Sequence, residues 1–183
     1  MMRRTLAALL VVAAVLIQTV LVNRLPVPWG AGPDLVVLTV VAVAMRTTAV
    51  TGAVAGFLGG LAVDTLPPAD HELGRYAMVL SLAGYLAGAL RDPLARVGGL
   101  WPFGVAALAA TGVSLGFAAI GAVLGDPRVT LTGVLGVLPP HLILTMVASP
   151  FVLYPVFWLL RRTDRDDFTA VGATLWANGG LIR

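Results

Sequence analysis

Few residues of this chain belong to types that carry out chemistry. Its 183 residues include no cysteine, two histidines, and twelve arginines without a lysine. The missing cysteines exclude disulfides and thiolate chemistry, and the missing lysines exclude a phosphate-binding loop that ends in lysine. The run from Gly112 to Gly116 matches the G-x-S-x-G nucleophile elbow around Ser114. That motif needs a sharp strand-to-helix turn, which an apolar helix cannot supply, so we expect no catalysis at Ser114.

The two histidines lie far apart in the sequence. His71 is in an expected loop, and His141 follows Pro140 with no acidic residue near it. An ionisable residue inside a membrane segment is a functional candidate, but carbonyl groups freed by adjacent prolines also offer it hydrogen bonds. We favour the structural role for His141. No spaced set of histidines and carboxylates predicts a metal ion, and we expect no cofactor.

Three charged residues mark a tight hairpin. Arg46 is the only charged residue between Asp34 and Asp64, and apolar runs lie on both sides of it. A charge at the centre of a bilayer costs roughly 3 kcal/mol or more, so these residues are expected where helices meet water. We interpret Asp64 as an outer helix cap or a partner for Arg75, with contact to another protein as the alternative.

Composition defines the class of protein. Hydrophobic residues make up 58% of the chain and charged residues 11%, against about 45 to 50% and 25% in a soluble domain. The arginines stand in ones and twos at the ends of apolar runs, which argues against nucleic-acid binding. We predict an integral membrane protein with one bundle over residues 1–162 and a cytoplasmic tail over residues 163–183.

The apolar runs predict an all-α polytopic bundle of six transmembrane helices. The expected spans are residues 5–22, 34–45, 50–66, 73–90, 102–124 and 131–160. The first run is longer than a signal-peptide core and no Ala-x-Ala follows it, so we expect an uncleaved helix. The second would be about 18 Å long, which is short enough for a re-entrant segment.

Counting arginines favours six crossings. With the N-terminus in the cytoplasm, nine arginines lie inside and three, Arg24, Arg75 and Arg128, lie outside. A re-entrant second segment would reverse this bias and violate the positive-inside rule. We therefore expect a multi-pass protein of the bacterial inner membrane with both termini in the cytoplasm.

The last span contains several prolines. We expect Pro139 and Pro140 to break it into a short piece over residues 131–138 and a kinked helix from about Leu142. Beyond Arg162, apolar residues recur at helical spacing. This tail predicts an interfacial helix, with a partner-binding helix as the alternative.

Glycines four residues apart form the most repeated pattern. Such spacing lets helix backbones approach closely, so we expect packing within the bundle, with docking of another protein's helix as the alternative. The pattern comprises Gly52, Gly56 and Gly60, then Gly84 with Gly88, Gly112 with Gly116, and Gly121 with Gly125.

Several segments resemble one known family. They are Pro33 to Leu38, Met45-Arg46, Gly52 to Asp64, Leu73 to Ala77, Gly84 to Gly88 and the ending with Tyr154-Pro155 and Arg161-Arg162. Over residues 5–162, and most strongly over 33–92, the chain is similar to MreD, the rod shape-determining membrane protein family. This resemblance implies a fold similar to the S-components of energy-coupling-factor transporters.

The resemblance also implies a function. It points to a non-enzymatic scaffold of the cell-wall elongation complex, beside an MreC-like single-pass protein, MreB, a SEDS glycosyltransferase and a class B penicillin-binding transpeptidase. The alternative is a vitamin-binding S-component, although the first span lacks that family's small residues four apart. As partner-binding or packing residues we single out Asp64, Arg46, Gly52, Gly56, Gly60, Gly84 and Gly88.

Overall fold

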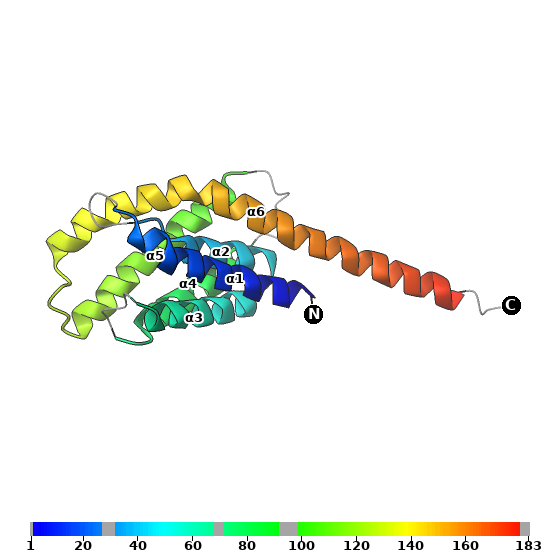
Figure 1. Cartoon of the computed structure of the whole chain (residues 1–183), viewed down its shortest axis with the longest axis horizontal. Coiled ribbons are helices and arrows are strands. Elements are labelled where there is room, and N and C mark those ends of the chain that lie inside the picture. The colour runs from blue at the N-terminus through cyan, green and yellow to red at the C-terminus, as the bar shows by residue number, and fades with distance from the viewer. Residues whose placement is uncertain (1, 27–31, 68–71, 92–98, 180–183) are drawn as a thin grey trace.

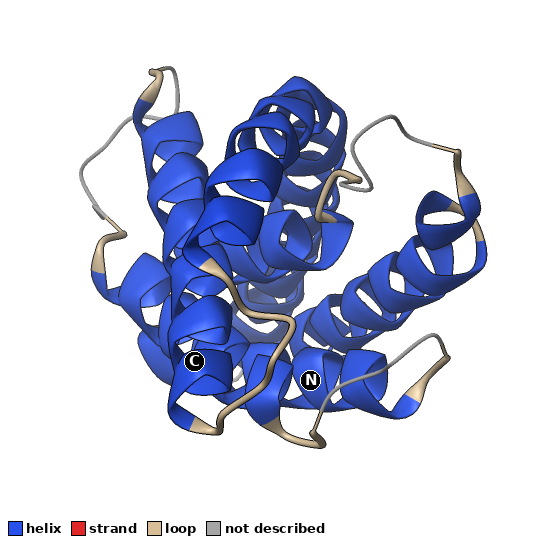
Figure 2. Ribbon diagram, turned by 90° about the vertical axis from the view of Figure 1, so that its left-hand side faces the viewer, coloured by secondary structure: helices blue, strands red, loops and turns tan. Residues whose placement is uncertain are grey.

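The computed structural model describes residues 2–26, 32–67, 72–91 and 99–179, with side chains up to residue 162. All regular structure within these residues is helical. Helices α1 to α5 lie side by side, and α6 runs along them and continues past one end of the bundle (Figure 1). The end-on view likewise contains only helices and loops (Figure 2). The predicted all-α architecture is therefore confirmed.

Local chemistry explains where the first helices begin. The elements are α1 (Met2–Val20), a 3-10 turn η1 (Val22–Arg24), α2 (Leu35–Arg46), α3 (Ala49–Thr65) and α4 (Arg75–Ala89). The side chain of Asp34 accepts a hydrogen bond from Val37 N at 2.9 Å, and that of Thr48 accepts one from Thr51 N at 3.1 Å. Such N-caps satisfy backbone donors that have no partner within the helix. Gly74 precedes α4 with a φ of 91°, a conformation that favours glycine.

The sixth helix differs from its prediction. α5 (Trp101–Val123) is followed by a turn and then by α6 (Leu131–Gly179), which is one continuous helix. The expected break at residues 139–140 is wrong. A proline leaves the carbonyl four residues before it without a helical donor, and a nearby hydroxyl can replace that donor. Ser149 does so beside Pro150, because its Oγ donates to Met146 O at 2.7 Å.

The expected tail begins inside the same helix. α6 continues as helix to Gly179, away from the other helices (Figure 1). Side chains from residue 163 onward lie outside the described part of the chain, so both readings of the tail stay predictions.

Helix α2 is the centre of the bundle. Every residue from Val36 to Ala44 is at most 3% exposed, and all of the other five helices pack against α2. Its 12 residues correspond to about 18 Å, well below the roughly 30 Å of a bilayer core. Because its neighbours surround it, α2 can be short without exposing its polar ends to lipid.

The bundle has two chemically different ends. Asp34, Asp64 and Asp126 lie at one, here called the acidic end, where Arg75 and Arg128 also contact Asp126. Arg4 and Arg46 lie at the other, the arginine end. α2 runs from Asp34, beside Thr145 of α6, to Arg46, beside Phe157 of α6. It therefore runs as a single helix from the acidic end toward the arginine end.

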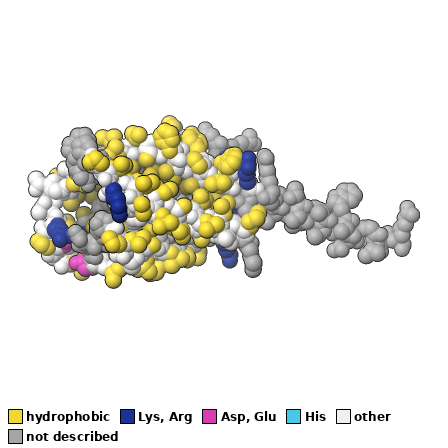
Figure 3. Space-filling view, viewed as in Figure 1, with side chains coloured by type: hydrophobic (Ala, Val, Ile, Leu, Met, Phe, Trp, Pro, Cys, Tyr) yellow, Lys and Arg dark blue, Asp and Glu magenta, His cyan; other side chains and the backbone are white. Residues whose placement is uncertain are grey.

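Among the described residues, three helical stretches are long and apolar enough to cross a membrane: Met2–Arg24, Trp101–Val123 and Leu131–Arg162. Helices α2 and α3 are apolar but shorter. Hydrophobic side chains cover the middle of the face in Figure 3, and the acidic side chains visible there lie at one end. The structure thus supports a membrane protein, while six crossings remain a proposal.

Candidate functional site

The predicted glycines lie between α3 and α4. Gly52 and Gly84 face each other with their backbones in contact, and Gly56 lies on the backbone of Leu80. A Cβ added at Gly60 would lie 2.5 Å from the Cα of Ala77, and one at Gly88 2.5 Å from the Cα of Ala49. All five glycines are buried. The stripe therefore allows the two helices to touch through their backbones, the situation in which van der Waals contact drives helix association.

The other glycine pairs have different surroundings. Gly112 has no atom near the position of a Cβ, whereas Gly116 makes room for the side chain of Val79. Gly121 lies directly beneath the guanidinium of Arg75, where any Cβ would overlap it. Gly125 ends α5 with a φ of 76°. The same spacing in the sequence thus occurs in four different surroundings. Gly112 borders open space, Gly116 contacts the side chain of Val79, Gly121 contacts the guanidinium of Arg75, and Gly125 ends a helix.

Asp64 caps a helix, although not its own. It lies in the last turn of α3 and is 3% exposed. Its Oδ2 accepts hydrogen bonds from the backbone N–H groups of Gly74 at 2.9 Å and Ala77 at 3.1 Å, at the start of α4. A carboxylate near a helix N-terminus is favourable because the exposed N–H groups carry partial positive charge. Asp64 therefore fastens the start of α4 to the end of α3.

Arg75 joins α4 to the end of α5. Its Nε and Nη2 donate to Phe117 O at 2.9 and 2.8 Å, and its Nη1 donates to Asp126 Oδ2 at 2.9 Å. The guanidinium lies 3.9 Å from the centre of the Phe117 ring, and Glu72 adds a longer ion pair at 3.5 Å. The hydrogen bond from Arg75, followed by that from Arg128 N, lowers the pKa of Asp126. Sequence reasoning counted Arg75 as an outside charge and considered it as a partner for Asp64, but missed its contacts with Asp126 and Phe117 O.

Asp34 is the centre of a second polar cluster at the acidic end. Its Oδ1 accepts the capping bond from Val37 N, and its Oδ2 accepts a short hydrogen bond from the hydroxyl of Tyr76. Its backbone N–H donates to Thr145 Oγ1 at 3.1 Å. The backbone N–H of Leu35, the next residue, donates to Gln18 Oε1 at 2.9 Å. One N-cap position thus connects α1, α2, α4 and α6.

His141 makes its contact with a distant loop. Its Nδ1 lies 2.8 Å from Gly32 O. Since a carbonyl only accepts, Nδ1 must carry the proton, and the other ring nitrogen, Nε2, remains available. The expected partner, a carbonyl freed by the adjacent prolines, is wrong, because His141 bonds to Gly32 O in another segment. His71 lies outside the described residues, and no group that could hold a metal occurs among those described.

Arg46 lies at the other end of α2. Its guanidinium is 4.9 Å from the ring centre of Phe157 on α6, and that of Arg162 is 3.8 Å from the ring of Trp158. Such cation–π contacts are favourable when the charge faces the ring.

Ser114, inside α5, donates to Ala110 O at 2.9 Å. Its surroundings are helical rather than the strand-to-helix turn of a nucleophile elbow.

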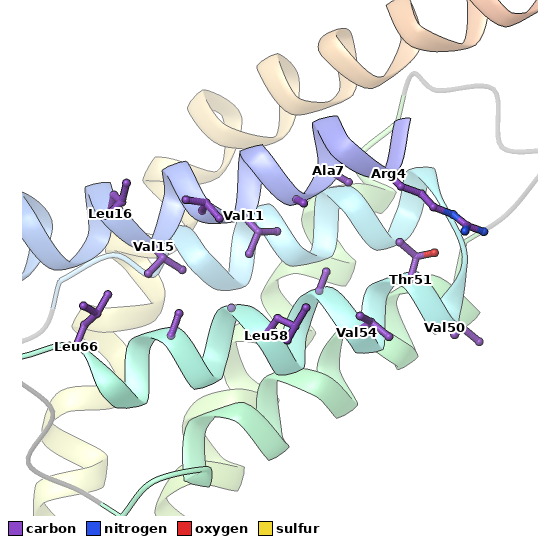
Figure 4. Close-up of a pocket in the computed structure, with 15 residues that line it drawn as sticks. Arg4, Ala7, Val11, Val15, Leu16, Val50, Thr51, Val54, Leu58 and Leu66 are labelled. Atoms are coloured by element: carbon purple, nitrogen blue, oxygen red, sulfur yellow. The ribbon is translucent and has the colours of Figure 1, made fainter. Parts of the chain in front are cut away.

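A groove and a cleft open among the described residues. A groove of about 570 Å³ runs between α1 and α3 (Figure 4) and is lined almost entirely by apolar side chains, with Arg4 at one end. A cleft of about 510 Å³ lies at the acidic end between α5 and α6, where Asp34, Tyr76 and His141 line it together with apolar residues. Sequence reasoning foresaw neither, because each requires the relative positions of separate helices.

These features define an all-helical protein of membrane character, held together by a glycine-lined helix pair and by polar clusters at one end. No family model, curated protein or solved structure matches the chain. Its function must therefore be inferred from its residues and their geometry.

Proposed function

We propose that this protein is a non-enzymatic scaffold of the bacterial cell-wall elongation complex, which determines rod shape. It binds the transmembrane helix of an MreC-like single-pass protein and so links the MreB cytoskeleton to the SEDS glycosyltransferase and the class B penicillin-binding transpeptidase. Support comes from the resemblance of residues 33–92 to the MreD family and, in the structure, from the groove between α1 and α3.

The groove is the observation that carries the proposal. Small residues such as Ala8, Ala55 and Gly59 line it together with larger ones such as Val12 and Leu58, which are 55% and 58% exposed. It follows α3 from Val50 to Leu66, a rise of about 25 Å. Small residues let a neighbouring helix approach closely, and this length suits a helix better than a compact ligand.

The two faces of α3 have different contacts, and this difference supports the groove as the docking site. Its stripe of Gly52, Gly56 and Gly60 is filled by α4, while the face with Val54 and Leu58 lines the groove. The helix-docking function that the glycine pattern suggested therefore belongs to the neighbouring face.

The proposal includes six membrane crossings in the inner membrane, with both termini in the cytoplasm. Asp34, Asp64 and Asp126 share one end, as expected if α1 to α6 alternate in direction across a bilayer. Under the positive-inside rule, nine of the twelve arginines would then be cytoplasmic.

A vitamin-binding S-component is the second candidate. The observation in its favour is the cleft between α5 and α6, which combines apolar walls with a few polar groups, as small-molecule sites do. The two candidates differ in their partners, since an S-component assembles with an energy-coupling ATPase module.

Pull-down from solubilised bacterial membranes separates the two. We expect the chain to recover a single-pass MreC-like protein in near-equal amount without nucleotide, metal or vitamin, and its depletion to make rod-shaped cells round. Recovery of an ATPase pair, or a vitamin retained by the purified chain, would overturn the scaffold proposal.

Matched variants test the groove itself. Val54→Trp and Leu58→Trp fill it from α3 and should each reduce recovery of the partner strongly. Ile143→Trp adds the same bulk on α6, at a side chain that is 63% exposed and outside the groove, and should leave recovery unchanged. If all three variants behave alike, the partner does not bind in the groove.

A further inference from the structure

The cleft at the acidic end has the properties of a small-molecule site. Its walls are apolar side chains of α5 and α6, among them Val113, Val134 and Leu138, and its volume is about 510 Å³. Pockets that bind small organic molecules have volumes of about 300 to 1,000 Å³ and combine apolar walls with a few convergent polar groups. Asp34 and Tyr76 supply such groups from α2 and α4.

The carboxyl group of Asp34 has hydrogen-bond partners but no ion-pair partner among the described residues. The residue is 8% exposed, and both carboxylate oxygens accept hydrogen bonds, from Val37 N and the Tyr76 hydroxyl. The ion pairs of Arg75 are with Glu72 and Asp126 rather than with Asp34. A buried charge in a membrane protein is costly without an oppositely charged partner, so a cation that enters the cleft is favoured beside Asp34.

Arg75 and Arg128 both line the cleft, and neither offsets this preference. The hydrogen bond from Arg75 and, as a smaller cause, the charge of Arg128 lower the pKa of Asp126, so the charge of Arg128 acts on that carboxylate. Arg75 directs its guanidinium to Asp126, Glu72 and Phe117 O. Its positive charge is therefore already paired with carboxylates. An anionic ligand would compete with these carboxylates and would be repelled by Asp34.

His141 adds a hydrogen-bond acceptor. His141 lines the cleft, and its Nδ1 lies 2.8 Å from Gly32 O. With Nδ1–H donating to that carbonyl, a neutral ring would present the lone pair of Nε2. An N–H group of a ligand can donate to this nitrogen.

We propose that the cleft between α5 and α6 binds a small organic amine, with its ammonium group paired to the Asp34 carboxylate and its apolar body between Val113, Val134 and Leu138. The cleft is lined by α2, α4, α5 and α6, and the groove by α1 and α3. Amine binding is therefore independent of the scaffold function and can succeed or fail separately from it.

Three probes of similar size but different charge test the proposal. Phenethylamine, phenethyl alcohol and hydrocinnamate share an apolar ring and carry an ammonium, a hydroxyl and a carboxylate. Each is titrated at neutral pH into the full-length chain in an uncharged maltoside detergent, and binding is measured by calorimetry. We expect saturable binding of phenethylamine and much weaker binding of the other two.

Two variants locate the site. Asp34→Asn keeps a good N-cap for α2 but removes the charge, and should weaken phenethylamine binding by roughly tenfold or more. Val134→Trp fills the cleft from α6 without changing Asp34 and should abolish binding. Leu58→Trp, in the groove between α1 and α3, is the control and should bind phenethylamine like the unaltered chain.

Three outcomes would overturn the proposal. They are absence of phenethylamine binding, equally tight binding of hydrocinnamate or phenethyl alcohol, and phenethylamine binding that neither Asp34→Asn nor Val134→Trp changes. The last would show partitioning into detergent or binding elsewhere on the chain.

Discussion

The two sides of α4 are built by opposite means. Toward α3, glycines bring the helix backbones into contact, with Gly52 against Gly84 and Gly56 against Leu80. Toward α5, the side chain of Val79 fits against Gly116, and the guanidinium of Arg75 lies on Gly121. The first contact extends along the helix. The second ends at the acidic end in the bonds of Arg75 to Asp126 and Phe117 O, here called the polar clasp.

The difference shows how an apolar bundle can combine close packing with open space. Backbone contact leaves no room between α3 and α4, and a larger side chain there must force the helices apart. The Arg75 clasp holds α4 and α5 through specific atoms at one end, and the cleft lies beside it. We therefore expect the glycine side to govern stability and the polar side to provide a binding site.

Cysteine labelling gives an all-or-none test of how the two ends of α4 lie relative to the membrane. The chain has no cysteine of its own. An impermeant maleimide on intact cells should label Val129→Cys at the acidic end, but Thr48→Cys and Gly99→Cys at the arginine end only after permeabilisation. Ala69, expected outside as well, lies beyond the described residues. Labelling of position 48 or 99 in intact cells would contradict the six-crossing topology.

A leucine in the glycine stripe should have the largest effect on stability. Gly56→Leu places a side chain against the backbone of Leu80, which cannot move aside as a flexible side chain can, and should cost about 3 kcal/mol. Gly112→Leu makes the same change at a glycine with open space and should alter the melting temperature in detergent little. Equal melting temperatures would show that α3 and α4 are not held by backbone contact.

The polar clasp should show a smaller effect that depends on pH. The lowered pKa of Asp126 means that its contact with Arg75 contributes stability above the unfolded pKa of about 4 and loses it as the pH falls through the folded value. The melting temperature of Asp126→Asn should therefore lie below that of the unaltered chain at neutral pH. The gap should close in acid. A gap that persists unchanged below the folded pKa would mean that the Asp126 charge is not its source.

Local chemistry in the sequence was enough to place most helices. The observed bounds of α1 to α5 lie within three residues of the expected spans. Asp34 does begin α2, and Asp64 does serve as a cap. These features depend on neighbouring residues, because apolar runs, caps and turn glycines act over one or two helical turns.

The prolines of α6 show the limit of such reasoning. Local rules predicted a break, yet the helix continues, and at Pro150 the Ser149 hydroxyl donates to the carbonyl that the proline leaves without a donor. Ser149 is adjacent to Pro150 in the sequence, so a hydroxyl beside a proline was a local sign that the helix could continue there.

Composition indicated the class of protein, the order of apolar residues gave the number of apolar runs, and glycine spacing predicted close helix packing. Only the tertiary structure decided that this stripe faces α4, that Arg75 pairs with Asp126 and that His141 meets Gly32. The physical reason is that many apolar helices can pack against one another. The sequence of one helix therefore does not specify which other helix contacts it. Contacts between residues far apart in the chain, and the groove and cleft that such packing leaves, arise only when the helices assemble.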